Sequence, residues 1–245
     1  MGLTTPVDDN LASNALLEKL TPQDRARLAP HLTAFDLAAG HVLHPAGEDV
    51  DETWFPCGGA MAAFCVSTNQ GANQVEVAVV GREGAVGGIV SNGHLPAYAT
   101  AEVRFAGRFL RIKTAALELA KLESLPLRHW FSRYSDCLLA QVFQTAACNA
   151  THTIAQRTAK WLLAAAARTN GNVFELTQDE LAQMLGVGRT FVNGTLKALR
   201  DKQVIATRRG FIEIKDTAAL RRMSCGCTVA IEEHFDIVLQ GIYAS

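Results

Sequence analysis

The sequence predicts an α+β fold in which a β jelly roll is followed by a long helix and a C-terminal winged helix-turn-helix. In residues 35–112, short apolar segments alternate with glycine-rich turns at a spacing of about ten residues, which is typical of β-rolls and sandwiches. From residue 126, apolar side chains recur at helical spacing. In residues 177–215, two helical segments flank a short glycine-containing turn, and two short strands follow.

These patterns divide the chain into four parts. Residues 1–125 contain the predicted roll and, ahead of it, a leucine-rich helical stretch in which Pro22 suits the first turn of a helix. Residues 126–150 form the long helix. Residues 151–222 form the winged helix-turn-helix, and residues 223–245 form a helical tail.

The long helix carries a stripe of side chains at alternating spacings of four and three residues, as the seam of a coiled-coil dimer does. We therefore expect two copies of the chain to pair along it. Two members of the stripe are polar and weaken the pattern. The predicted seam consists of Leu127, Phe131, Tyr134, Leu138, Gln141 and Thr145.

The helix-turn-helix is the most specific pattern in the chain. Thr177 and Glu180 have the spacing of a capping box, so a helix begins there. The turn 186–188 ends that helix, and Arg189 begins the next one. A unit of this kind places its second helix in the major groove of DNA. A β-hairpin wing follows, and the two cations at its tip are Arg208 and Arg209.

Charge distinguishes this unit from an ordinary helical hairpin, which has the same local pattern. Val192, Leu196 and Leu199 share the buried face of the second helix, and its cations lie elsewhere. Residues 150–222 carry 12 Lys and Arg against 6 Asp and Glu, although the net charge of the whole chain is −1. A basic module of this size is expected for a protein that contacts phosphates.

The segment resembles the winged helix of the Crp/Fnr family of bacterial transcription regulators, through residues 176–182 (LTQDELA) and 186–189 (GVGR). The resemblance implies a homodimer that binds double-stranded DNA at a near-palindromic operator and contacts RNA polymerase. It also implies that Arg189 reads a base, since arginine suits bidentate contact with guanine. Gly188, Thr190 and Gly194 stand where many members carry serine, glutamate and a second arginine, so a different operator is expected.

The DNA contacts expected from this resemblance fall into two groups. Arg189, Thr190 and Asn193 would face bases. Cations and polar side chains around them would hold phosphates, which position a protein on DNA without specifying the sequence. The full expected DNA-binding set is Thr177, Gln178, Gly188, Arg189, Thr190, Asn193, Lys197, Arg208 and Arg209.

The roll resembles the cyclic-nucleotide-binding-like sensory domain of the same family, through residues 55–59, 75–77 and 80–84. The positions for ribose and phosphate fall at residues 87–89 and 97–99, which lack the glutamate and arginine of members that bind cyclic AMP. Because a cyclic phosphate without arginine loses its main charge-assisted contact, cyclic AMP is not expected. The effector is unknown, and a packed roll without ligand is the alternative. The effector pocket is expected at Glu76, Gly87, Gly88, Tyr98 and Thr100.

The chain has six cysteines, and none precedes Cys57, which excludes the N-terminal cysteine group that holds an iron–sulfur cluster in some relatives. Cys225 and Cys227, with His234 beyond them, are candidates for a metal site or a redox pair. Cys148 and His152 share one helical face and could also bind a metal. Packing of small side chains is the preferred interpretation of both pairs.

Haem is a further possibility, because some relatives bind haem in the roll. The spacing of the histidines does not indicate which of them would be the ligand. The candidate ligands are His31, His41, His44, His94 and His129.

The sequence lacks the patterns that are typical of membrane proteins, secreted proteins and common enzyme classes. No apolar run reaches the ~18 residues of a membrane span, and no signal-peptide pattern is present, so a cytoplasmic protein is expected. No nucleophile elbow, P-loop, zincin or dinucleotide-binding motif occurs, so an enzyme is not expected. The alternative function is a ligand, haem, metal or redox sensor whose winged helix contacts a protein instead of DNA.

Overall fold

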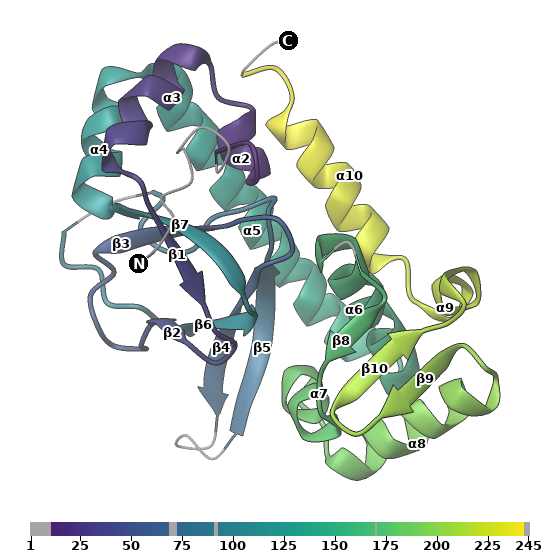
Figure 1. Cartoon of the computed structure of the whole chain (residues 1–245). Helices are drawn as coiled ribbons and strands as arrows, with labels where there is room; N and C mark the ends of the chain where they lie inside the picture. Colours follow the sequence, from purple (N-terminus) through teal and green to yellow (C-terminus); the bar gives the residue numbers. More distant parts are fainter. Residues whose placement is uncertain (1–10, 69–72, 91–92, 170, 243–245) are drawn as a thin grey trace.

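A computed structural model of the protein describes residues 11–68, 73–90, 93–169 and 171–242. Figure 1 shows a β-roll with helices at one end, a long helix α5 that leaves the roll, and a smaller helical domain with its own short sheet. The order and type of these parts confirm the predicted α+β fold. None of the helices in the described part of the chain combines the length and the apolar character of a membrane span.

The chain enters the roll through two short helices, α2 (Ala15–Glu18) and α3 (Pro22–Leu28), and a 3-10 turn, η1 (Ala29–His31). Asn14 caps α2, because its side-chain oxygen accepts hydrogen bonds from the first turn. The side-chain amide nitrogen of Asn14 donates to the carbonyl oxygens of Pro56 (2.8 Å) and Gly84 (2.9 Å). One buried side-chain amide therefore fixes the N-terminal helices to the end of β3 and to the loop at Gly84.

The roll consists of two antiparallel sheets, as the alternation of apolar segments and turns in residues 35–112 predicts. One sheet has the order β1-β7-β3 and the other β2-β6-β4-β5. Apolar side chains of both sheets, such as Phe109 of β7 and Val103 of β6, form a buried core. The strands are β1 (Thr33–Leu37), β2 (Val42–His44), β3 (Glu52–Pro56), β4 (Met61–Thr68), β5 (Asn73–Val80), β6 (Thr100–Phe105) and β7 (Gly107–Lys113).

Helices α4 (Thr114–Glu123) and α5 (Leu125–Thr151) follow the roll. The hydroxyl oxygen of Ser124 accepts a hydrogen bond from the amide of Leu127, and Pro126 lies in the first turn of α5, so the helix begins at Leu125. Trp130 of α5 donates from its indole nitrogen to the carbonyl of Leu16 (3.1 Å). Helix α5 is thus packed against the N-terminal segment of the chain.

The predicted dimer seam of α5 lies mostly inside the protomer. Leu127, Phe131 and Tyr134 are at most 1% exposed and belong to the core that α5 shares with α2, α4 and the roll. Gln141 donates to the carbonyl of Val79 at 3.0 Å and is also buried. The spacing of the stripe therefore reflects packing onto the roll, which needs the same helical periodicity as a coiled coil. The other two members, Leu138 and Thr145, are half-buried.

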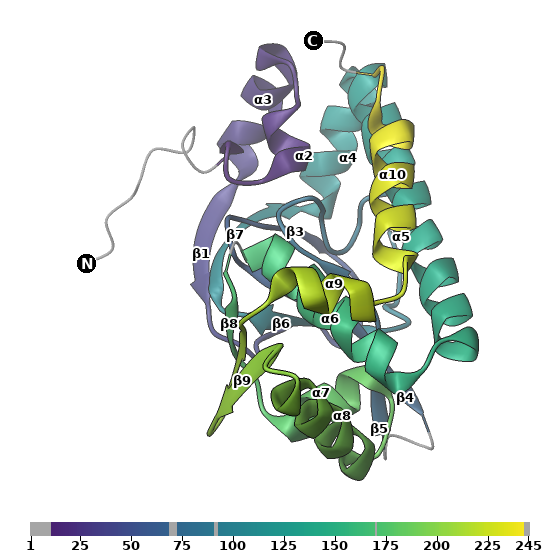
Figure 2. The same cartoon turned by 90° about the vertical axis from the view of Figure 1, so that its right-hand side faces the viewer.

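The C-terminal domain begins with α6 (Ile154–Thr169) and is built around a three-stranded antiparallel sheet of order β8-β10-β9. Strand β8 (Val173–Glu175) has three residues and was not predicted from the sequence. The remaining elements are α7 (Gln178–Leu185), α8 (Arg189–Asp201), β9 (Ile205–Arg208), β10 (Phe211–Ile214) and α9 (Thr217–Met223). The tail forms α10 (Cys227–Leu239), which lies along α5 (Figure 2).

Candidate nucleic-acid interface

The first helix of the helix-turn-helix, α7, has the predicted capping box. The hydroxyl of Thr177 accepts a hydrogen bond from the amide of Glu180 (3.2 Å), and the Glu180 carboxylate accepts one from the amide of Thr177 (2.6 Å). Gly186 ends the helix in the left-handed conformation (φ 64°), which glycine adopts without steric cost. The local sequence thus fixes both ends of α7 and the direction of the turn.

The second helix, α8, buries one face and exposes the other. Val192, Leu196 and Leu199 are at most 1% exposed and pack into the domain core, as the sequence predicts. The opposite face is open to solvent and carries both cations and polar groups. Its exposed members are Arg189, Thr190, Asn193, Gly194 and Lys197.

Phe191 is an exposed residue of α8 that sequence reasoning missed. Its side chain is 63% exposed on the first turn of the helix, next to Arg189 and Thr190. Its position in the sequence could have predicted this exposure. Phe191 lies one place before Val192 of the buried stripe, so its aromatic side chain falls outside the core-facing side of the helix. An exposed apolar side chain at this place can contact the methyl group of thymine.

Arg189 forms an ion pair with Asp179, the second residue of α7, at 3.1 Å. Both side chains are more than half exposed, and pairs of this kind contribute about 0–1 kcal/mol. The pair therefore holds the guanidinium at the N-terminal end of α8. Because the pair is weak, releasing the guanidinium from Asp179 costs little free energy. A guanine edge or a phosphate can replace Asp179 as the partner of Arg189.

The wing is the hairpin of β9 and β10, whose register pairs Arg208 with Phe211. Gly210 has φ 76° and permits the tight turn. Arg208 and Arg209 are exposed at the tip, as predicted. Arg200 of α8 donates to the Thr207 hydroxyl at 2.8 Å and joins the helix to the wing. The two cationic segments are therefore held as one unit.

The helix-turn-helix domain shares a buried surface with the roll. Phe105 of β6 stacks on Phe174 of β8, with ring centroids 5.8 Å apart, and lies 6.2 Å from the ring of Trp161. Gly186 approaches Val75 so closely that a Cβ at this position would lie 3.2 Å from the valine side chain. The turn of the helix-turn-helix is thus packed on strand β5.

Of the predicted effector residues, Glu76 has an interdomain role. Its carboxylate accepts a hydrogen bond from the Trp161 indole nitrogen (2.7 Å) and lies 3.3 Å from the Arg104 guanidinium. Burial raises the pKa of the Glu76 carboxyl above its ordinary value, and the charge of Arg104 opposes that effect. Sequence reasoning missed both partners, which are distant along the chain.

The other predicted effector residues lie in different surroundings. Gly87 (φ 84°) packs against His44, and Gly88 (φ 51°) packs against Thr114, so neither position leaves room even for a Cβ. Tyr98 is 88% exposed, and the Thr100 hydroxyl accepts a hydrogen bond from the backbone of Ala46. Glu76 borders a cavity with residues of α5, α6 and α10, and the lining of that cavity includes none of these four residues.

The candidate haem ligands are scattered over the described roll and helices. His44 is buried, and burial lowers the pKa of its imidazole. His94 is exposed and lies 2.9 Å from the Asp49 carboxylate. The remaining three are exposed and lie in different elements or loops: His31, His41 and His129.

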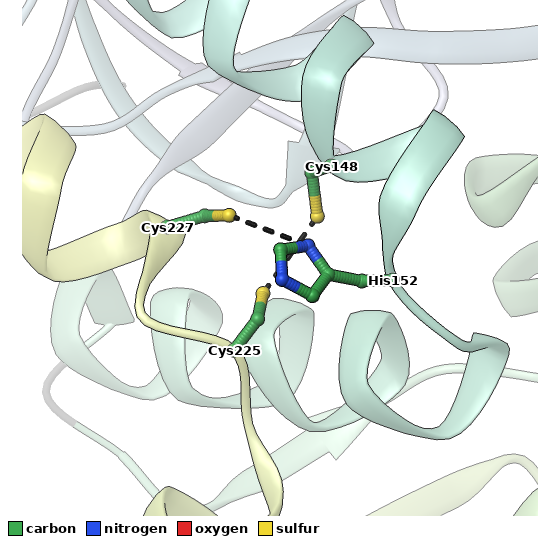
Figure 3. A group of neighbouring side chains, drawn as sticks. All are labelled: Cys148, His152, Cys225 and Cys227. Atoms are coloured by element: carbon green, nitrogen blue, oxygen red, sulfur yellow. Dashed lines mark hydrogen bonds between the residues drawn. The ribbon is translucent and has the colours of Figure 1, made fainter.

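The two cysteine pairs of the sequence analysis come together. Cys225 and Cys227 lie beside Cys148 and His152, and the ligand atoms of all four are within 4.8 Å of one another (Figure 3). His234 is exposed on α10 and is not part of this group. The sequence indicated each pair but not that they form one cluster.

Comparison with known proteins identifies the domain that contains α7, α8 and the wing. Residues 156–223 match the family described as the Crp-like helix-turn-helix domain. No curated protein sequence matches the chain significantly.

Solved structures match over most of the chain. FixK2 from Bradyrhizobium japonicum is similar with a TM-score of 0.66 at 14% identity, over 79% of this chain and 98% of FixK2. A transcriptional regulator of the CRP/FNR family from Thermus thermophilus has a TM-score of 0.64 at 20% identity, over 79% and 97% of the two chains. A CooA mutant from Carboxydothermus hydrogenoformans has a TM-score of 0.59 at 14% identity, over 91% and 97%. The chain therefore has the fold of the Crp/Fnr regulators and carries a Crp-like helix-turn-helix domain at residues 156–223.

Proposed function

We propose that the protein is a sequence-specific, DNA-binding regulator of transcription that acts in the cytoplasm as a homodimer. The observation that carries the proposal is the exposed face of α8. Arg189, Thr190, Asn193 and Lys197 share this face, and the apolar residues of the helix are buried on the other side. A helix held in this way by a capped preceding helix is suited to the major groove.

In this proposal, the side chains on the first turns of α8 read the bases. Arg189 donates to a guanine, and Thr190 and Asn193 contact neighbouring base edges. Two such helices related by a twofold axis would recognise a near-palindromic operator with half-sites about one helical turn apart. Gly188 and Gly194 leave the backbone of α8 uncovered, so this operator is expected to differ from those of relatives with serine and arginine there.

The phosphates would be held by groups around α8 and on the wing. Lys197, Arg208 and Arg209 are exposed cations without an ion-pair partner among the described residues. The Thr177 hydroxyl and the Gln178 side chain lie at the start of α7, where backbone amides also favour anions. Contact with RNA polymerase is proposed from the resemblance to the Crp/Fnr family alone.

A dimer through α5 needs a face that the protomer leaves open. Leu139 and Phe143 are exposed apolar residues, 49% and 63% accessible, one or two positions beyond Leu138 and Gln141 of the predicted seam. Ala146 and Ala150 continue this face at spacings of three and four residues. We name Leu139, Phe143, Ala146 and Ala150 the outer stripe of α5 and propose it as the dimer contact.

The test is a DNA-binding titration at several salt concentrations with an operator first selected from random duplexes. Three phosphate-binding cations per protomer, or six per dimer, predict a slope of log K against log salt of about −5. A slope near zero for every duplex would instead support the alternative, in which the winged helix contacts a protein. Lys113, an exposed cation at the end of β7 remote from α8, is the control site, because Lys113→Ala should leave the slope unchanged.

A further inference from the structure

Four potential metal ligands meet where two separate segments of the chain, residues 148–152 and 225–227, converge. Cys148 lies in the last turn of α5, and His152 follows that helix directly. Cys225 lies between α9 and α10, and Cys227 is the first residue of α10. Figure 3 shows the four side chains pointing toward a common centre from the long helix and from the tail.

Two of the six distances between the ligand atoms match the edges of a coordination tetrahedron, and all six are within 4.8 Å. The Sγ atoms of Cys148 and Cys225 are 3.7 Å apart, and Cys227 Sγ is 3.7 Å from His152 Nδ1. With Zn–S bonds of about 2.3 Å and Zn–N bonds of about 2.0 Å, tetrahedral geometry gives edges of about 3.5–3.8 Å. A disulfide requires sulfurs about 2.05 Å apart, and all three cysteines are free thiols.

The surroundings of the cluster are those of a closed structural site. Cys148, Cys225 and Cys227 are at most 8% exposed and form a buried cluster of their own. The side-chain amide of Gln144 donates to Cys227 Sγ at 3.2 Å, as outer hydrogen-bond donors do to metal-bound thiolates. With four protein ligands, no coordination position remains for water or substrate.

We propose that Cys148, His152, Cys225 and Cys227 bind one zinc-class divalent cation in a tetrahedral site. Three sulfurs and one imidazole form a soft ligand set that suits zinc and excludes magnesium and calcium. On binding, the ion replaces the protons of the three thiols, which pass to the solvent, and the imidazole binds in its neutral form. The cation is resident and its role is structural.

The site would fix the joint between the two domains. His152 separates α5 from α6, which begins at Ile154 and leads into the helix-turn-helix domain. The tail that supplies two sulfurs also contacts α5 further along, where Arg133 donates to the carbonyls of Val238 and Gln240. A bound cation therefore links the end of α5, the start of α6 and α10, and so restricts the orientation of the DNA-binding domain.

The experiment uses the full-length protein purified under reducing conditions, stripped with a chelator and titrated with Co²⁺. We expect one Co²⁺ per protomer, with the intense d–d and sulfur-to-metal charge-transfer absorption of a tetrahedral thiolate site, and full displacement by Zn²⁺. Mass spectrometry of the protein before stripping should show one bound ion. Neither readout depends on DNA binding, so the result is independent of the proposed function.

Variants identify the ligands. Cys227→Ser and His152→Ala should abolish stoichiometric binding, and Gln144→Ala should weaken it by about 10–100-fold while all four ligands remain. His234→Ala is the matched control, since it removes an exposed histidine of the same helix outside the cluster. Circular dichroism verifies that each variant is folded, and Gln144→Ala remains informative where a ligand variant is not.

Several outcomes would overturn the proposal. The wild-type protein could fail to bind Co²⁺, or binding could survive in Cys227→Ser. A tetrahedral signal that disappears in His234→Ala would place the ion elsewhere. A Cys148–Cys225 disulfide in the protein as isolated, found by peptide mapping without reduction, would show a redox pair in place of a metal site.

Discussion

The indole nitrogen of Trp161 on α6 donates a 2.7 Å hydrogen bond to the carboxylate of Glu76 on β5. This bond crosses from the helix-turn-helix domain to the roll, and both partners are buried. Arg104 lies 3.3 Å from the same carboxylate and 2.9 Å from that of Glu102. The orientation of the helix-turn-helix domain on the roll is therefore coupled to one buried carboxyl group.

Replacing Glu76 by Gln should stabilise the protein increasingly as pH rises. Because burial raises the pKa of Glu76 in the folded protein, the folded state holds its proton more tightly than the unfolded state does. The wild type consequently loses stability as pH rises from the ordinary value of 4.5 through the raised pKa, and each tenfold difference in proton affinity corresponds to about 1.4 kcal/mol. Unfolding temperatures of both proteins at pH 5 and pH 8 provide the measurement.

The control for this prediction is Glu102→Gln, which removes the other carboxylate beside Arg104 but leaves the Trp161 bond intact. It separates loss of an ion pair from relief of a buried charge. If the advantage of Glu76→Gln shrank with rising pH, attraction to Arg104 would outweigh burial, and the pKa of Glu76 would lie below its ordinary value.

The contrast between Thr177 and Glu76 shows how far the sequence predicts the site. The capping box and the buried stripe of α8 depend on neighbours within four residues, so their spacing in the chain reveals them. The partners of Glu76 are 28 and 85 residues away. The Arg104 contact depends on the strand order within one sheet and the Trp161 contact on how two domains meet, and no local pattern encodes either.

The α5 stripe illustrates a second limit. The stripe was predicted as a dimer seam, and Leu127, Phe131 and Tyr134 are buried within the protomer on one face of the helix. The pattern does not say whether the covering surface belongs to the same chain or to a second copy. The same ambiguity applies to the cysteines, because the approach of Cys225 to Cys148 depends on α10 returning along α5.

Arg189→Ala should abolish the preference for the operator over random DNA. A bidentate contact to guanine contributes about 1–3 kcal/mol per half-site, and two half-sites double that effect. Arg208→Ala, which removes an exposed cation of the wing, should weaken binding to all duplexes alike and reduce the salt slope by about 1 per protomer. Titrations of both variants against operator and random duplex measure the ratio, and an unchanged ratio in Arg189→Ala would refute the assignment.

Gly194→Ala should stabilise the free protein but weaken its binding to DNA. Alanine is favoured over glycine within a helix by about 1 kcal/mol, and nothing lies within 4 Å of a Cβ at this position. Glycine at this position lowers the stability of α8, and its presence is explained if the helix backbone approaches the DNA closely there. A raised unfolding temperature with reduced operator affinity is expected. Unchanged or tighter DNA binding would show that the groove leaves space at Gly194.

Phe143→Asp should convert a dimer into a monomer if the outer stripe of α5 is the contact between copies. Phe143 is 63% exposed, so the substitution should leave the fold of the protomer intact while placing a charge between the two helices. Leu119→Asp is the matched control, because Leu119 is 64% exposed on α4, away from this stripe. Molar mass from light scattering at several concentrations distinguishes the two variants.

Tyr134→Asp, in the predicted seam, should instead unfold the protomer, since Tyr134 fills the space beside Gly84 and donates to the Ala85 carbonyl. A folded, monomeric Tyr134→Asp together with a dimeric Phe143→Asp would restore the original seam and remove the outer stripe as the contact.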